Sequence, residues 1–121
     1  MMANVYRKIT WHTACGLGLA LPEAEESTSY GTPALKVRGK LFARLWEDGE
    51  TLVVRTTHEE REDMIAAEPR IYFLTDHYAD HPWVLVHMSK VSREALADLL
   101  ARAHSLAKPA RSATPGKRQS R

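Results

Sequence analysis

Five basic side chains fall in or near one short segment of this 121-residue chain, and their chemistry suits contacts with phosphate. They are Lys36, Arg38, Lys40, Arg44 and Arg55. Lysine and arginine donate hydrogen bonds to phosphate oxygens, and flat aromatic neighbours such as Phe42 and Trp46 can stack on bases. The same cations also fit ordinary solvated strand positions, with Phe42 and Trp46 packed under a helix or at a protein contact. The segment therefore predicts a DNA-binding surface and leaves a purely structural interpretation open.

A β-hairpin is the element that would position these cations. In Arg38-Gly39-Lys40 a glycine stands where a tight turn needs a positive φ. A three-residue loop would give one apolar face made of Leu35, Val37, Leu41, Ala43 and Leu45. The opposite face would then carry Lys36, Phe42, Arg44 and Trp46. A two-residue loop would shift the register by one residue and mix the two faces, so we predict the three-residue loop.

A second group of side chains is suited to a small-molecule pocket. Ligand pockets combine aromatic walls with a few polar groups. Both are present in Tyr30, Tyr78, His81 and Trp83. The neighbouring His77 and His81, together with His87, are also of the type that ligates divalent metals. Pro82 follows directly, however, and disfavours the regular helix that a His-x-x-x-His ligand pair needs. We therefore expect an ordinary loop at this place and no metal site.

The chain carries no recognisable catalytic pattern. Neither a serine nor the one cysteine, Cys15, has a base at a spacing typical of nucleophilic catalysis. Free cysteine is usually buried, so we expect Cys15 to pack in the interior. Gly16-Leu17-Gly18 lacks the third glycine and the preceding strand of a dinucleotide-binding motif, and no phosphate-binding loop is present. We expect a non-enzymatic protein without a cofactor.

Composition predicts one globular domain followed by a basic tail. With 44% hydrophobic and 26% charged residues, the chain can bury one substantial core. Of its 17 basic side chains, five lie in residues 108–121, which contain no acid, so residues 1–107 hold 12 basic and 15 acidic side chains. We expect residues 108–121 to be disordered and to attract polyanions without specificity. No apolar run reaches about 18 residues, and one cysteine suits a reducing compartment, so we expect a cytoplasmic protein that does not enter a membrane.

Apolar periodicity and turn residues predict the order of the elements. Helices are expected at residues 6–20, 57–67 and 93–106. Thr57 with Glu60 fits a capping box at the start of the second, and Ser92 fits an N-cap at the start of the third. Strands are expected at residues 27–30, 51–56, 71–74 and 83–88 and in the two arms of the hairpin. The order α-β-β-β-β-α-β-β-α has its strands in runs, which is typical of an α+β domain. We predict a single two-layer domain in which an antiparallel sheet is flanked by helices.

Several short sequence blocks together indicate a family through their order and spacing. They are Ala20-Leu21-Pro22, Glu25-Glu26, Tyr30-Gly31-Thr32-Pro33, the hairpin from Lys36 to Leu45, and Trp83-Val84 before the last helix. In this arrangement the chain resembles the MmcQ/YjbR family over most of its length. A further block, from Thr75-Asp76-His77-Tyr78 to Val86, is similar to one branch of that family. The resemblance implies a small α+β domain, also described as a double-wing or CyaY-like fold, in bacterial proteins labelled as predicted DNA-binding proteins.

The resemblance implies that DNA is the partner. The hairpin cations that match the family pattern and would contact phosphates are Lys36, Arg38, Lys40 and Arg44. Two other functions stay open from the residues themselves. One is a protein-interaction or chaperone-like domain that uses Phe42 and Trp46, and the other is a small-molecule binder around Tyr30 and Trp83. We expect a monomer or a weak homodimer.

Overall fold

The elements of the computed structural model follow one another in the predicted order. The structure describes residues 9–108, so residues 1–8 and all but the first residue of the predicted tail lie outside the described residues. The elements are α1 (Trp11–Leu19), β1 (Ala24–Ser29), β2 (Thr32–Val37), β3 (Lys40–Leu45), β4 (Thr51–Arg55), α2 (His58–Ala67), β5 (Tyr72–Phe73), η2 (Asp76–Tyr78), β6 (Trp83–His87) and α3 (Arg93–Ala107). Of these, η2 is a short 3₁₀ turn. None of the helices within residues 9–108 is long and apolar enough to cross a bilayer.

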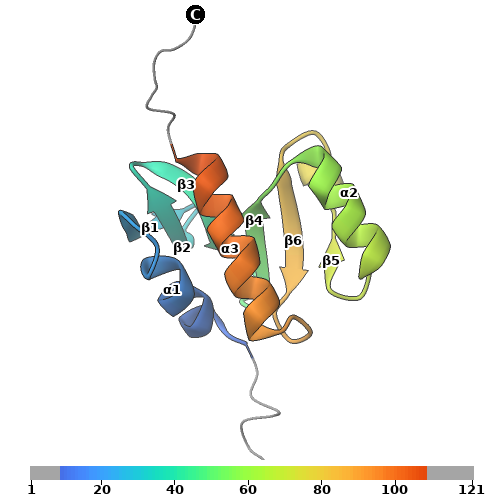
Figure 1. Ribbon diagram of the computed structural model, residues 1–121, viewed down its shortest axis with the longest axis horizontal. Coiled ribbons are helices and arrows are strands. Elements are labelled where there is room, and N and C mark those ends of the chain that lie inside the picture. The colour runs from blue at the N-terminus through green and yellow to red at the C-terminus, as the bar shows by residue number, and fades with distance from the viewer. Residues whose placement is uncertain (1–8, 109–121) are drawn as a thin grey trace, which may run out of the picture.

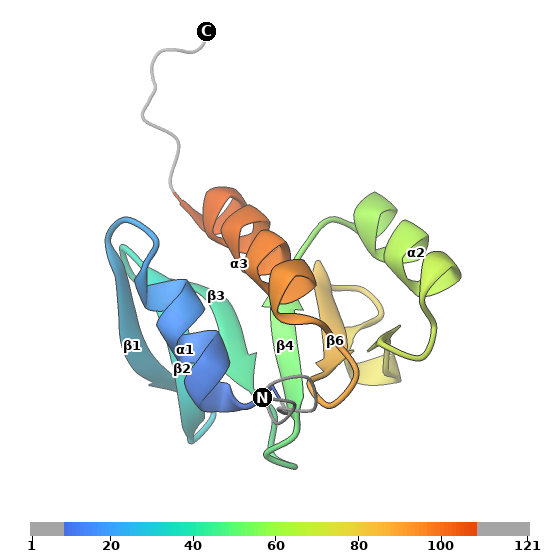
Figure 2. The same ribbon diagram turned by 60° about the horizontal axis from the view of Figure 1, so that its bottom comes forward.

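The strands form one antiparallel sheet, in the order β1-β2-β3-β4-β6-β5. Strands that follow one another in sequence pair with each other, except that β4 pairs with β6 and β5 takes the edge. The helices α1, α2 and α3 lie together on one face of this sheet (Figures 1 and 2). One layer of helices on one antiparallel sheet confirms the predicted α+β fold class.

The main core lies between the helices and the sheet. The helix α3 contributes Leu96, Leu100 and Ala103, which are fully buried and recur at helical spacing. From the strands it receives Leu35, Val37, Leu52, Val54, Val84 and Val86. Successive strand residues point to opposite sides, so the residues between these face away from the helices, on a surface that we call the open face. A smaller apolar cluster lies on that face, around Val53, Tyr78 and Leu85.

The first helix and the first strand start at different residues from those predicted. Within the described residues α1 begins at Trp11, because Thr10 is extended and its hydroxyl accepts a hydrogen bond from the Thr13 N–H as an N-cap. The strand β1 begins at Ala24, so it includes Glu25 and Glu26, which precede the predicted strand. Charged residues suit this position because β1 is an edge strand, where they discourage pairing with another chain.

The two later helices begin with the predicted caps. The Ser92 hydroxyl accepts a hydrogen bond from the Ala95 N–H, and the Thr57 hydroxyl accepts one from the Glu60 N–H. In both bonds the nitrogen and oxygen are 3.1 Å apart. The side chain of Glu60 does not return to Thr57, as a capping box requires. It forms an ion pair with Arg102 of α3 instead. The predicted capping box is therefore only half formed, and its glutamate ties α2 to α3.

Candidate nucleic-acid interface

The turn of the basic hairpin is one residue shorter than predicted. Val37 pairs with Lys40, so the loop contains only Arg38 and Gly39. These two residues have φ angles of 52° and 81°. Two successive positive φ angles are typical of the two-residue turn whose twist matches that of paired strands. The prediction of a three-residue loop is therefore wrong.

A bulge keeps the apolar residues on the helix side in spite of the shorter turn. The pairing register shifts just after Leu35, which leaves Phe42 as an extra residue on β3. Phe42 turns into the core, where it is fully buried and meets the His104 ring edge-on at 5.5 Å between centroids. Leu41 lies instead on the open face, paired with Lys36. The predicted faces are thus wrong at Leu41 and Phe42, and Phe42 is not placed to stack on a base.

The hairpin cations other than Arg44 lie beside the acidic residues of β1 and of the turn before it. Arg38 binds the Glu23 carboxylate through two nitrogens, with Nε 2.6 Å and Nη2 3.2 Å from its oxygens. Lys36 stands directly opposite Glu25 in the register of β1 and β2. Lys40 is exposed at the turn and forms no ion pair with a described residue. The hairpin therefore presents alternating charges and not one continuous positive face.

Arg44 is buried, in contrast to the exposed position that the hairpin pattern predicts. Its side chain and backbone together are only 4% exposed. Nη1 donates hydrogen bonds to the Thr32 hydroxyl at 3.0 Å and the Leu45 carbonyl at 3.3 Å, and it lies 3.4 Å from a Glu47 carboxylate oxygen. Nη2 donates to the Tyr78 hydroxyl at 2.8 Å. Arg44 therefore joins β3 to neighbouring segments and forms the floor of a hollow.

The four residues predicted to line a pocket surround this hollow on the open face. Tyr30, Tyr78, His81 and Trp83 all line it, and its volume is about 210 Å³. The Arg44 guanidinium lies 5.2 Å from the centroid of the Tyr30 ring. Tyr30 as a whole residue is 81% exposed. No described residue accepts a hydrogen bond from Nε of Arg44, so this donor is available to a ligand in the hollow.

Arg55 supplies a second fixed cation beside the hollow. Its guanidinium lies 4.7 Å from the centroid of the Trp83 ring, and its Nε donates a 3.0 Å hydrogen bond to the Leu41 carbonyl. Burial lowers the pKa of Arg55 below its ordinary value, but an arginine stays charged in proteins. A guanidinium held over an indole is partly stripped of water, which strengthens its attraction to an anion or a base.

Sequence reasoning missed Arg61, which holds the loop at the rim of the hollow. Arg61 is 5% exposed and lies on α2. Its guanidinium donates hydrogen bonds of 2.6 to 3.1 Å to backbone carbonyls of the loop at residues 78, 79, 81 and 83. The available signal was its place as the one basic residue within the acidic run Glu59-Glu60-Arg61-Glu62-Asp63. Helix neighbours one or two positions away do not face one another, so Arg61 does not pair with these acids and donates to the loop carbonyls instead.

The thiol and the imidazoles form no reactive cluster within residues 9–108. Burial, and then the hydrogen bond and charge of Glu26, raise the pKa of Cys15 to about 11. The thiol is therefore protonated at neutral pH and is a poor nucleophile. Among the described residues no three His, Cys, Asp or Glu side chains gather as metal ligands would.

Comparisons with known proteins agree with the fold and with the sequence resemblance. Protein DR2400 of Deinococcus radiodurans, a DUF419-domain protein of known crystal structure, superposes with a TM-score of 0.70 over 82% of this chain and 78% of that one, at 22% identity. No protein with a curated description matches. The model of the YjbR family matches residues 19–106. Since that match covers well over half of the 121 residues, the chain belongs to the YjbR family.

Proposed function

We propose that this YjbR-family chain is a non-enzymatic DNA-binding protein whose contact surface is the open face of the sheet together with the β2–β3 hairpin. The observation that carries the proposal is Arg55 held against Trp83 beside the hollow above Arg44. Aromatic faces and fixed cations on one surface are the two elements from which binding sites for unpaired strands are built. The surface thus favours single-stranded over duplex DNA.

Phosphate contacts would come from the exposed edge of this surface. Lys36 and Lys40 extend from the hairpin, and Arg38 is exposed at its turn. The Arg38–Glu23 ion pair is open to solvent, where such pairs are weak, so a phosphate can replace the carboxylate. With so few cations, the affinity should be modest and strongly salt-dependent.

A base would enter the hollow. The exposed Tyr30 ring offers a stacking surface at its rim, and Nε of Arg44 offers a hydrogen-bond donor at its floor. Carbonyl oxygens and ring nitrogens of bases are acceptors that this donor can serve. Arg44 thus belongs to the proposed site as a base contact, whereas the hairpin pattern had assigned it to phosphate.

Fluorescence anisotropy of a labelled single-stranded oligonucleotide, with a duplex of the same sequence alongside, tests the proposal. Lys36→Glu should weaken binding about fivefold, since it replaces an attraction by a repulsion. Lys90→Glu makes the same charge change at an exposed residue before α3 and should change the affinity less than twofold. Residues 109–121 are present in every variant, so their contribution cancels. If both variants weaken binding equally, or if neither does, the open face is not the DNA-binding surface.

The alternative functions predict different outcomes of the same measurements. A protein-interaction domain would use Trp46, which is half-buried on the open face near Phe73. It would give a salt-insensitive dimer in sedimentation experiments and no binding of the oligonucleotide. A small-molecule binder would leave the oligonucleotide unbound, whereas a free mononucleotide would bind in the hollow.

A further inference from the structure

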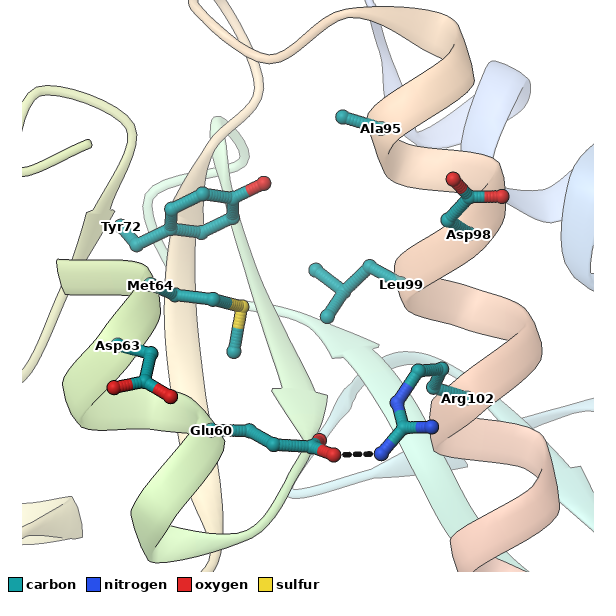
Figure 3. A pocket seen from close by; sticks show the side chains of 8 residues that line it. All are labelled: Glu60, Asp63, Met64, Tyr72, Ala95, Asp98, Leu99 and Arg102. Atoms are coloured by element: carbon teal, nitrogen blue, oxygen red, sulfur yellow. Dashed lines mark ion pairs between the residues drawn. The ribbon is translucent and has the colours of Figure 1, made fainter. Parts of the chain in front are cut away.

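A second cavity lies on the opposite side of the molecule from the hollow, between α2 and α3 (Figure 3). Its volume is about 390 Å³, within the range of small-molecule sites. The side chains that line it, which we call the groove residues, are Glu60, Asp63, Met64, Tyr72, Ala95, Asp98, Leu99 and Arg102. Neither the proposed DNA contacts nor the hollow on the open face includes any of them.

The groove has an apolar floor and one closed end. Met64 from α2 and Leu99 from α3 point toward each other across it, and the ion pair between Glu60 and Arg102 crosses one end (Figure 3). Methionine adapts its shape to an aliphatic partner because its side chain is unbranched and polarisable. A ligand in the groove would therefore pack its apolar section against Met64 and Leu99.

Tyr72 places an unused polar group inside the groove. The residue is only 9% exposed, its hydroxyl points toward α3, and no described residue forms a hydrogen bond with it. Burial, and then the charge of Glu68, raise the pKa of the Tyr72 phenol, so the hydroxyl is neutral at physiological pH. The hydroxyl oxygen is not one of the buried side-chain atoms that lack a partner, so it is accessible from the groove. A ligand in the groove can therefore form a hydrogen bond with it.

The charges on the groove walls indicate the sign of the charge on that ligand. Arg102 is paired with Glu60, whereas Asp63 on α2 and Asp98 on α3 have no cationic partner among the described residues. Two carboxylates on facing walls favour a ligand with a positive charge at more than one place. A metal ion fits poorly, because the floor is apolar and no three acidic or imidazole side chains gather there within residues 9–108.

We propose that the groove between α2 and α3 binds an aliphatic polyamine. Its ammonium groups would pair with Asp63 and Asp98 and donate a hydrogen bond to the Tyr72 hydroxyl. Its methylene segment would lie on Met64 and Leu99. This site is independent of the proposed DNA surface, since no residue is shared between them.

Titration of the full chain with spermidine, followed by amide chemical shifts, tests the site. Shifts should saturate and be centred on the groove residues. Tyr72→Phe, which keeps the ring, and Asp98→Asn should each weaken binding about tenfold, because each removes a contact to a charged group. Asp80→Asn makes the same charge change at an exposed loop residue and should change the affinity less than twofold. Ala95→Leu fills the groove without any change in charge and should abolish binding, once its thermal unfolding shows that it is folded.

Three outcomes would overturn the proposal. The first is a lack of saturable shifts at millimolar spermidine. The second is equal weakening by Asp80→Asn and Asp98→Asn, which indicates a diffuse ion atmosphere and no site. The third is equally tight binding of an uncharged diol of similar length, which shows that the groove accepts an apolar partner regardless of its charge.

Discussion

The guanidinium of Arg44 donates a 2.8 Å hydrogen bond to the hydroxyl of Tyr78, across 34 positions of sequence. This contact joins a central strand to the loop between β5 and β6. It makes Arg44 the floor of the hollow and Tyr78 one of its walls. A cation that the hairpin pattern predicts at the surface is thereby part of the structure that supports the site.

Tyr78→Phe should destabilise the fold by about 1–3 kcal/mol, because it leaves a donor of the buried Arg44 without its partner. Tyr30→Phe is the matched control. Tyr30 is 81% exposed and its hydroxyl has no partner among the described residues, so the expected change is below about 0.5 kcal/mol. Denaturant unfolding of both variants measures the difference, and equal stabilities would contradict the structural role of this hydrogen bond.

Two glycines of α1 should respond in opposite directions to the same substitution. Gly16→Ala should stabilise the protein by about 0.5–1 kcal/mol, since alanine favours a helix and a Cβ at Gly16 meets no atom within 4 Å. Gly18→Ala should destabilise it by about 1–3 kcal/mol through overpacking, because a Cβ there would lie 2.5 Å from Cδ1 of the fully buried Leu35. Thermal midpoints that rise for both variants would show that Leu35 moves aside easily.

Arg61→Lys should destabilise the loop at residues 75–82 although it keeps the charge. A lysine ammonium cannot span the four carbonyls that the arginine fork reaches. We expect a loss of about 2 kcal/mol or more, since several buried acceptors lose their donor. The rate of amide hydrogen exchange should then increase more in this loop than in α3. The control Arg70→Lys, at an exposed position, should change the stability by less than about 0.5 kcal/mol.

The stability of the protein should fall as the pH rises from about 9 to about 11, in part through Cys15. The pKa of the thiol is raised from 9.0 to about 11 by burial first and then by Glu26. The folded state therefore keeps a proton that the unfolded chain loses, and stability decreases wherever the unfolded state binds fewer protons. Cys15→Ala should remove this part of the pH dependence, so the measured quantity is the difference between the two unfolding curves. Parallel curves over this range would contradict the shifted pKa.

Local sequence patterns predicted those features that depend on neighbours along the chain. The caps at Thr57 and Ser92 and the order of the elements follow from interactions within three or four residues or from a simple period of polarity. The hollow was predicted in part, because Tyr30, Tyr78, His81 and Trp83 share the side-chain types that ligand pockets use. Their meeting in space depended on the pairing of β4 with β6, which no local pattern specifies.

The sequence by itself determined the family, the α+β class, the run of elements and the position of the hairpin turn at Gly39. Only the tertiary structure decided the register of the hairpin, the inward turn of Phe42 and the burial of Arg44 and Arg61. The reason is physical. A one-residue bulge has little effect on local energies, but it decides which side chains meet the core, so its position is selected by the packing of distant elements. Likewise, a buried arginine can be recognised only when the acceptors that compensate it are known, and those of Arg44 and Arg61 lie up to 34 positions away in the chain.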